Sequence, residues 1–286
     1  MSLEVQISTD LPIIETHQHI SERGKGDRTF GWSGNNIENI VGAMSAAHVV
    51  AAILQPLGGA EDPIAVHREI AENMAAYPGH IFGIASLNIK EYGEDKTVRE
   101  LEYCVKELGF VGIKLHGFSH GFAPNSPLGR VYFETADRLG VPLMGCVGAH
   151  GMPFTNPGLY ADMALEFPDL KVVFAHLDYP VAEEAVSIAR RQPNIYLSSS
   201  LSIPAYLRLA LENCGPHKLL LASEDSGSIA AEIAKFAALG ATDNELEQML
   251  CTTPAEVFAL KGRVASAPPN APAVSMARQA GFVGTA

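Results

Sequence analysis

The sequence is poor in positive charge. Its 286 residues contain 20 lysines and arginines against 32 aspartates and glutamates, which gives a net charge of -12, and the basic residues form no run. Proteins that bind nucleic acid neutralise its phosphates with clustered lysine and arginine. The composition therefore argues against nucleic acid as a partner, although a local pocket can still be positive enough for a small anionic substrate.

Segments that would cross a membrane or direct export are also missing. A membrane-spanning helix needs about 18 apolar residues in a row, and no such run occurs. The first ten residues, MSLEVQISTD, lack the basic and apolar regions of a signal peptide. The four cysteines show no CxxC spacing, which is typical of reduced thiols and not of a disulfide framework. These absences predict a cytoplasmic protein that does not use a membrane as partner.

Short apolar runs recur along the chain, in which hydrophobic residues make up 47%. Each run is nearly continuous and turns polar at its end, as expected of a parallel strand buried on both faces. The runs span residues 11–19, 48–56, 81–88, 110–117, 141–148, 171–178, 194–200 and 218–225. Helical patterns lie between them, and a capping-box pattern at Thr242 and Glu245 predicts a helix over 242–250.

Eight strands that alternate with helices predict an α/β protein with a single (β/α)₈ TIM barrel over residues 1–261. The rival, a doubly wound open sheet, usually has fewer strands and a glycine-rich first turn, and no GxGxxG follows the first strand. Residues 21–35 are expected to form either a lid at the pocket rim or a solvated loop. Residues 262–286, rich in alanine and proline, are expected to form an extension outside the barrel.

Polar residues stand at the predicted carboxyl ends of four strands, where the active groups of this fold collect. They are His17, His19, Lys114, His116, His176, Asp178, Glu224 and Asp225. Because a strand has a period of two residues, His17 and His19 point to the same side, with Cα atoms about 6.6 Å apart. Their imidazoles can converge on one ion at roughly 2.1 Å from each nitrogen. A lone HxH pair is weak, so the other strand-end groups make it a candidate metal site.

The strand-end motifs resemble the amidohydrolase superfamily. The similar branch is the amidohydrolase-related one, which includes aminocarboxymuconate-semialdehyde decarboxylase and the pyrone and sugar-acid lactonases, and the resemblance covers about residues 11–261. IIETHQHI resembles the first-strand HxH of that branch, GFVGIKLHG its fourth strand and FPDLKVVFAHLDYP its sixth strand. KLLLASEDSG resembles the eighth strand and CTTPAEVFAL the closing helix.

The resemblance implies one divalent metal, Zn²⁺ first and Mn²⁺ as the alternative. His17, His19, His176 and Glu224 would be its ligands, with polarisation of the substrate as the other role for His176. The eighth-strand carboxylate would hold a metal-bound water, whose pKa falls toward about 7, and act as general base.

The fourth strand would supply substrate contacts. Lys114 and His116 share a face by the period of two, and Lys114 would contact an anionic group of the substrate. In one variant of the superfamily a carboxylated lysine of the fourth strand bridges two metals, but a simple pocket cation is the better interpretation of Lys114.

The fifth strand departs from the family pattern. The family's histidine should fall near Gly145 or Cys146, and neither is histidine. Cys146 as a thiolate, or His150 from the next loop, could take that place beside the metal or substrate. The alternative is that no fifth-strand ligand exists.

The first and eighth strands carry smaller departures. Glu15 stands where the family usually has aspartate and, by the strand period, lies on the side of His17, whose ring it could orient. Glu224 aligns with the family's eighth-strand aspartate, while Asp225 has the usual residue type. The alignment favours Glu224 narrowly.

These features predict an enzyme, a metal-dependent hydrolase of a small carboxylate-bearing ester, lactone or amide. Two alternatives keep the site: non-oxidative decarboxylation of an unsaturated or aromatic acid, and a metal-free lactonase, which the missing fifth-strand histidine favours. A non-catalytic ligand-binding barrel is an alternative of another class, because a fold does not establish a function. The expected partners are a small, anionic substrate and a second copy of the chain in a homodimer.

Overall fold

Eight parallel strands form one sheet in chain order from β1 to β8. The structure is a computed structural model and describes residues 11–21, 35–148 and 151–270. Each predicted apolar run overlaps one of its strands, which confirms the predicted number and order. The strands are β1 (Ile13–Ile20), β2 (Val49–Pro56), β3 (Ile81–Ala85), β4 (Gly112–Leu115), β5 (Leu143–Cys146), β6 (Val172–Ala175), β7 (Ile195–Ser198) and β8 (Leu219–Leu220).

The chain that follows β8 returns to β1 and brings the ends of the sheet together. The backbone N–H of Thr16 donates to the carbonyl of Leu221 at 3.0 Å. Farther along, Glu224 donates to the carbonyl of His17 and accepts from the N–H of His19, both at 2.8 Å. The result is a nearly closed barrel, which confirms the predicted TIM fold.

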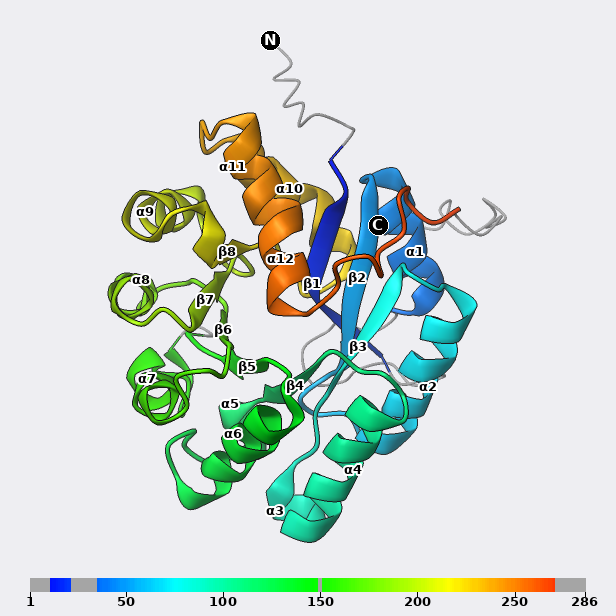
Figure 1. Cartoon of the computed structure of the whole chain (residues 1–286), viewed down its shortest axis with the longest axis vertical. Coiled ribbons are helices and arrows are strands. Elements are labelled where there is room, and N and C mark those ends of the chain that lie inside the picture. The colour runs from blue at the N-terminus through cyan, green and yellow to red at the C-terminus, as the bar shows by residue number, and fades with distance from the viewer. Residues whose placement is uncertain (1–10, 22–34, 149–150, 271–286) are drawn as a thin grey trace, which may run out of the picture.

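Helices surround the strands, and strands and helices alternate along most of the chain (Figure 1). Several begin at a side-chain cap: Asp62 accepts from the N–H of Ala65, and the predicted capping box of Thr242 and Glu245 is present. The helices are α1 (Ile37–Ala46), α2 (Pro63–Ala76), α3 (Ile89–Tyr92), α4 (Glu94–Lys106), α5 (Gly117–His120), α6 (Pro127–Leu139), α7 (Pro157–Glu166), α8 (Ala182–Arg191), α9 (Pro204–Cys214), α10 (Ile229–Ala237), α11 (Asp243–Glu247) and α12 (Thr253–Val257).

The apolar side chains form two layers. One lies between the strands and the helices, and the other fills the inside of the barrel with strand residues such as Ile53, Ile84 and Met144. Val257 and Phe258, at the end of α12, join the inner layer. The interior of the barrel is therefore a packed core, and the polar groups lie at the carboxyl ends of its strands.

A register shift interrupts β1. Glu15 pairs with Ala52 of β2 and Gln18 with Leu54, so three steps along β1 match two steps along β2. The extra residue is a bulge, and it breaks the alternation of side chains between Glu15 and His17. The expectation that these two side chains share a side rests on an alternation that this register shift interrupts.

The ends of the chain and one loop lie mostly outside the described residues. The predicted lid or rim loop falls on 22–34, and most of the predicted C-terminal extension falls on 271–286. The first part of that extension returns to the barrel, where the N–H of Ala265 donates to the carbonyl of Gly79 at 3.0 Å. In the described part of the chain, no helix has both the length and the apolar character needed to span a membrane.

Gly145 of β5 explains why no histidine stands at this position. A Cβ atom there would lie 2.2 Å from Cε1 of Tyr160, whose ring is fully buried. The Tyr160 hydroxyl donates to the carbonyl of Leu115 at 3.3 Å, so the ring is held in place. No side chain fits at Gly145 unless α7, which carries Tyr160, moves.

Replacing Gly145 with alanine should therefore lower the free energy of unfolding by about 1–3 kcal/mol, the usual cost of overpacking. Gly42→Ala is the matched control, because nothing lies within 4 Å of its Cβ position in α1. It should stabilise the protein by about 0.5–1 kcal/mol. Urea denaturation of both variants tests the packing, and equal effects would contradict it.

Candidate metal centre

Glu224 lies among three histidines at the carboxyl end of the barrel. Its Oε1 is 3.1 Å from Nδ1 of His17 and 3.2 Å from Nδ1 of His176. Its Oε2 is 3.3 Å from Nε2 of His19. All four side chains are buried, and the histidine pair of β1 meets side chains from the ends of β6 and β8.

Unusual backbone geometry directs two of these side chains. His176 and Glu224 have φ angles of 72° and 70°, in the left-handed region that non-glycine residues rarely adopt. Each such residue costs roughly 1–3 kcal/mol and persists only where the surroundings enforce it. In both residues the backbone leaves the extended conformation just after a strand, β6 for His176 and β8 for Glu224. The two side chains meet there.

The hydrogen bonds of His19 fix which of its nitrogens faces the cluster unprotonated. Its Nδ1 lies 3.2 Å from the carbonyl oxygen of Pro56, which can only accept, so the proton of the neutral ring is on Nδ1. Burial lowers the pKa of both His17 and His19, which favours neutral rings. The lone pair of His19 Nε2 therefore points toward His17 and Glu224.

The two facing nitrogens have a spacing suited to a shared cation. Nε2 of His17 is 3.2 Å from Nε2 of His19, and the Nζ of Lys114 is 3.5 Å from the same His17 atom. When each neutral ring carries its proton on Nδ1, the lone pairs of the two Nε2 atoms face each other. Two nitrogens at about 2.1 Å from one ion would stand roughly 3.0–3.4 Å apart.

Two buried atoms of the cluster have no hydrogen-bond partner within the described part of the chain. They are Nδ1 of His17 and Oε1 of Glu224, which approach each other without hydrogen-bond geometry. Ligand-type atoms of His17, His176 and Glu224 all lie within 4.8 Å of one another. Imidazole nitrogens with a carboxylate oxygen are a donor set that suits a divalent first-row metal. The residues therefore fit a metal ion.

The charges around His176 favour a positive charge at this point. Burial lowers the pKa of His176, but the negative charges of Glu224 and Cys146 outweigh it and raise that pKa to about 10. Ser200, which follows β7, places its Oγ 2.9 Å from Nδ1 of His176. Ser200 is not among the residues predicted from the sequence, where its one signal is the run of three serines at the end of the seventh strand.

The fourth and fifth strands supply the residues predicted to touch the substrate. Lys114 is buried beside His17, and burial lowers its pKa. Burial raises the pKa of the Cys146 thiol, but His116 and His176 outweigh it and hold that pKa well below its usual range. Cys146, like His19, lies outside the group of His17, His176 and Glu224 whose ligand atoms are all within 4.8 Å of one another. His116 uses Nδ1 to accept from the N–H of Ser119 at 3.2 Å, and His150 lies outside the described residues.

The two neighbouring carboxylates, Glu15 and Asp225, face other partners. Asp225 accepts from the N–H of Gly227 at 2.8 Å and from the hydroxyl of Ser228 at 2.9 Å, so it caps the next turn. Glu15 accepts from the backbone N–H of His17 and, at 2.8 Å, from that of Ser223. It thus holds the backbone of His17 and not the ring, and burial raises its pKa to about 8.

The sequence profile of the amidohydrolase family matches residues 14–260. The chain belongs to the amidohydrolase family. A γ-resorcylate decarboxylase from Polaromonas sp. (strain JS666 / ATCC BAA-500) is 38% identical over 85 residues, which cover 30% of this chain and 24% of that enzyme. The match therefore spans about a quarter of that relative's length.

Solved structures of decarboxylases share the fold. The 2,6-dihydroxybenzoate decarboxylase from Rhizobium has a TM-score of 0.70 at 18% identity, covering 88% of this chain and 100% of that one. The 5-carboxyvanillate decarboxylase from Novosphingobium aromaticivorans, complexed with manganese and 4-hydroxy-3-methoxy-5-nitrobenzoic acid, has a TM-score of 0.70 at 14% identity. It covers 91% of this chain and 100% of its own.

A second group of metal-type side chains, His67, Glu100 and Cys104, is already internally bonded. Nδ1 of His67 donates to Glu100 at 2.9 Å, and its Nε2 accepts from the N–H of Ser86 at 3.0 Å. Arg68 donates to the other Glu100 oxygen at 2.8 Å. Since both nitrogens of His67 are in use, this group is a structural network that holds the end of β3.

This network predicts a loss of stability in acid. Burial raises the pKa of Glu100, but hydrogen bonds from His67 and Arg68 outweigh it and lower that pKa to about 2. The contribution of Glu100 should be complete above its ordinary pKa of 4.5 and disappear as the pH falls toward 2. Urea denaturation from pH 6 to 2.5 should show a shallower pH dependence for Glu100→Gln than for the wild type. The exposed Glu38→Gln should keep the wild-type slope, and identical slopes for all three would contradict the assignment.

The positions of the two eighth-strand carboxylates predict opposite results for their substitution. Glu224→Gln should weaken Mn²⁺ or Zn²⁺ binding by more than about 100-fold, because loss of a ligand costs more than loss of a residue that supports one. Asp225→Asn should stay within about threefold of wild type, as expected for a side chain outside the cluster. Calorimetric titration measures both affinities, and the reverse order would exchange the two roles.

Proposed function

We propose that this protein is a metal-dependent decarboxylase of hydroxylated aromatic acids. The observation that carries the proposal is the buried cluster of three histidines and Glu224 with Lys114 beside it. Membership of the amidohydrolase family, with named relatives that decarboxylate γ-resorcylate and 2,6-dihydroxybenzoate, supports the reaction. The hydrolase prediction has no comparable support.

His17, His19, His176 and Glu224 would hold the ion. A bound divalent metal supplies Lewis acidity, which polarises an oxygen of the substrate and lowers the charge on it. Manganese is the first metal to test, because the 5-carboxyvanillate decarboxylase relative was complexed with it, and zinc is the second.

Lys114 would bind and orient the acid. The substrate carries a negative charge into a buried site, where an unpaired anion is costly. The Lys114 ammonium is buried at 3.5 Å from His17, so it lies close enough to the cluster to pair with that charge. This contact would set the carboxylate-bearing ring carbon next to Glu224.

Glu224 would handle the proton. In the reaction the ring carbon that carries the carboxylate takes up a proton, and the bond to the carboxylate then breaks. Its electron pair restores the aromatic ring as carbon dioxide leaves. Oε1 of Glu224 faces His17 and His176, and Oε2 lies 3.3 Å from His19, so the carboxylate oxygen that does not hold the ion would pass the proton.

The manganese-loaded protein should release carbon dioxide from 2,6-dihydroxybenzoate or a related hydroxybenzoate. Lys114→Met should lower kcat/KM about 10- to 100-fold, since a hydrogen bond to a charged group contributes roughly 1.5–3 kcal/mol. The matched control is Lys261→Met. Lys261 is exposed and pairs with Glu256, so this variant should have wild-type activity.

Carbon dioxide release and loss of substrate absorbance measure the reaction, with and without removal of the metal by a chelator. Hydrolysis of lactones or esters by the same preparation, with no carbon dioxide from any hydroxybenzoate tested, would contradict the proposed reaction.

A further inference from the structure

A cavity lies beside the metal centre and is called the loop cavity here. It has a volume of about 350 Å³ and lies between residues 57–63, residues 86–91 and residues 118–120 of α5. These segments follow the carboxyl ends of β2, β3 and β4, which are neighbours in the sheet. The loop cavity is therefore at the active end of the barrel, and its volume is in the range of small-molecule sites.

The loop cavity shares a wall with the metal centre but contains none of its four proposed ligands. Leu57, at its edge, follows Pro56, whose carbonyl contacts His19 at 3.2 Å. A Cβ atom on Gly58 would lie 2.9 Å from Cδ2 of His116, so the loop after β2 touches that ring. His116 and this loop thus lie between the two sites.

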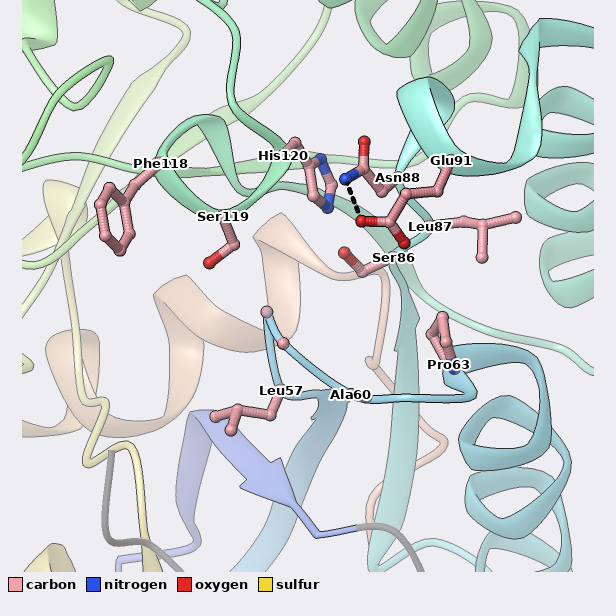
Figure 2. A pocket seen from close by; sticks show the side chains of 12 residues that line it. Leu57, Ala60, Pro63, Ser86, Leu87, Asn88, Glu91, Phe118, Ser119 and His120 are labelled. Atoms are coloured by element: carbon pink, nitrogen blue, oxygen red, sulfur yellow. Dashed lines mark hydrogen bonds between the residues drawn. The ribbon is translucent and has the colours of Figure 1, made fainter. Parts of the chain in front are cut away.

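Polar groups without partners line the loop cavity. His120 is only 4% exposed, and its Nδ1 has no hydrogen-bond partner in the described part of the chain. The hydroxyls of Ser86 and Ser119 also lack partners among those residues, and Figure 2 shows them with His120 around the space above Leu57. The Asn88 amide donates to Glu91 at 2.9 Å, which leaves the second carboxylate oxygen of Glu91 available.

The charges of the lining exclude an anionic ligand. No lysine or arginine is among the described residues that line the loop cavity, and Glu91 contributes a carboxylate. Burial lowers the pKa of His120 to about 3, so the ring stays neutral at ordinary pH. Leu57, Pro63 and Leu87 add apolar surface. The lining suits a neutral molecule with an apolar ring and hydroxyl groups that can both donate and accept.

The walls are held rigidly before any ligand arrives. The N–H of Ser86 donates to His67 at 3.0 Å, within the network of Glu100 and Arg68. The Tyr132 hydroxyl donates to the carbonyl of Leu87 and accepts from the N–H of Ile89 at 3.1 Å. A backbone fixed in this way loses little entropy when a ligand binds beside it.

We infer that the loop cavity binds a neutral ring that carries two hydroxyl groups, between Ser86 and Ser119 on one side and His120 and Glu91 on the other. This inference goes beyond the proposed reaction, because it requires neither the metal nor turnover. The ligand is either the far end of a large substrate or a separate small molecule with the same chemistry.

The probe for this site is 4-hydroxybenzyl alcohol. It is neutral and has hydroxyls at opposite ends of one ring, and it lacks the carboxylate or adjacent oxygens that would bind a metal. Saturation-transfer NMR and calorimetry on the full chain should give a dissociation constant on the order of 1 mM, typical of so small a ligand. Affinity should be unchanged in His17→Ala, so failure of the proposed metal centre leaves this test valid.

Three variants test the residues. The double variant Ser86→Ala, Ser119→Ala should bind the probe about tenfold more weakly, since two hydrogen bonds are lost. Ser187→Ala, in the exposed face of α8, is the control and should bind like wild type. His120→Phe should bind more weakly and yet melt at a higher temperature, because it replaces an unpaired buried ring between Phe122 and Tyr132 with an apolar one.

The opposite signs for His120→Phe distinguish a binding residue from a structural one. A lower melting temperature with unchanged probe affinity would overturn the inference, as would wild-type affinity in the double serine variant or no binding at all. Adding 2,6-dihydroxybenzoate separates the two sources of ligand. Competition with the probe identifies the loop cavity as part of the substrate site, and simultaneous binding identifies a second site.

Discussion

The seam between β1 and the chain after β8 is the constraint on which the site depends. Glu224 donates its N–H to His17 and accepts from the N–H of His19, so the hydrogen bonds that close the barrel also position the candidate metal ligands. Glu15 strengthens the same seam by accepting from the backbone of both His17 and Ser223. A slip of one residue along this seam would turn the side chains of one strand to the other face. The same hydrogen bonds thus close the barrel and assemble the site.

The cluster destabilises the folded chain. Three imidazoles, a carboxylate and the Lys114 ammonium are all buried, and two residues adopt left-handed backbone conformations. Polar groups taken out of water destabilise a protein unless partners compensate for the lost hydration, yet His17 Nδ1 and Glu224 Oε1 have none among the described residues. A divalent cation held by His17 Nε2, His19 Nε2 and Glu224 would compensate the buried carboxylate, which is why the arrangement is better explained by metal binding than by stability.

The sequence predicts the strand positions and the histidine pair because both follow from short-range patterns. Continuous apolar runs that turn polar mark buried parallel strands, and the ends of β1, β6 and β8 carry the side chains that meet. The side on which Glu15 lies could not be predicted, because a bulge in β1 depends on its pairing with β2. The same holds for the choice between Glu224 and Asp225, which a left-handed backbone conformation at Glu224 decides. The contact of Ser200 with His176 and the loop cavity both bring together segments that are distant in sequence, and no local pattern marks them.

Anomalous diffraction from a manganese-soaked crystal of the full chain tests the metal centre most directly. The account predicts one strong peak within about 2.0–2.3 Å of His17 Nε2, His19 Nε2 and a Glu224 oxygen. A peak at His67 and Glu100, or no peak at the cluster while manganese is bound elsewhere, would contradict the account.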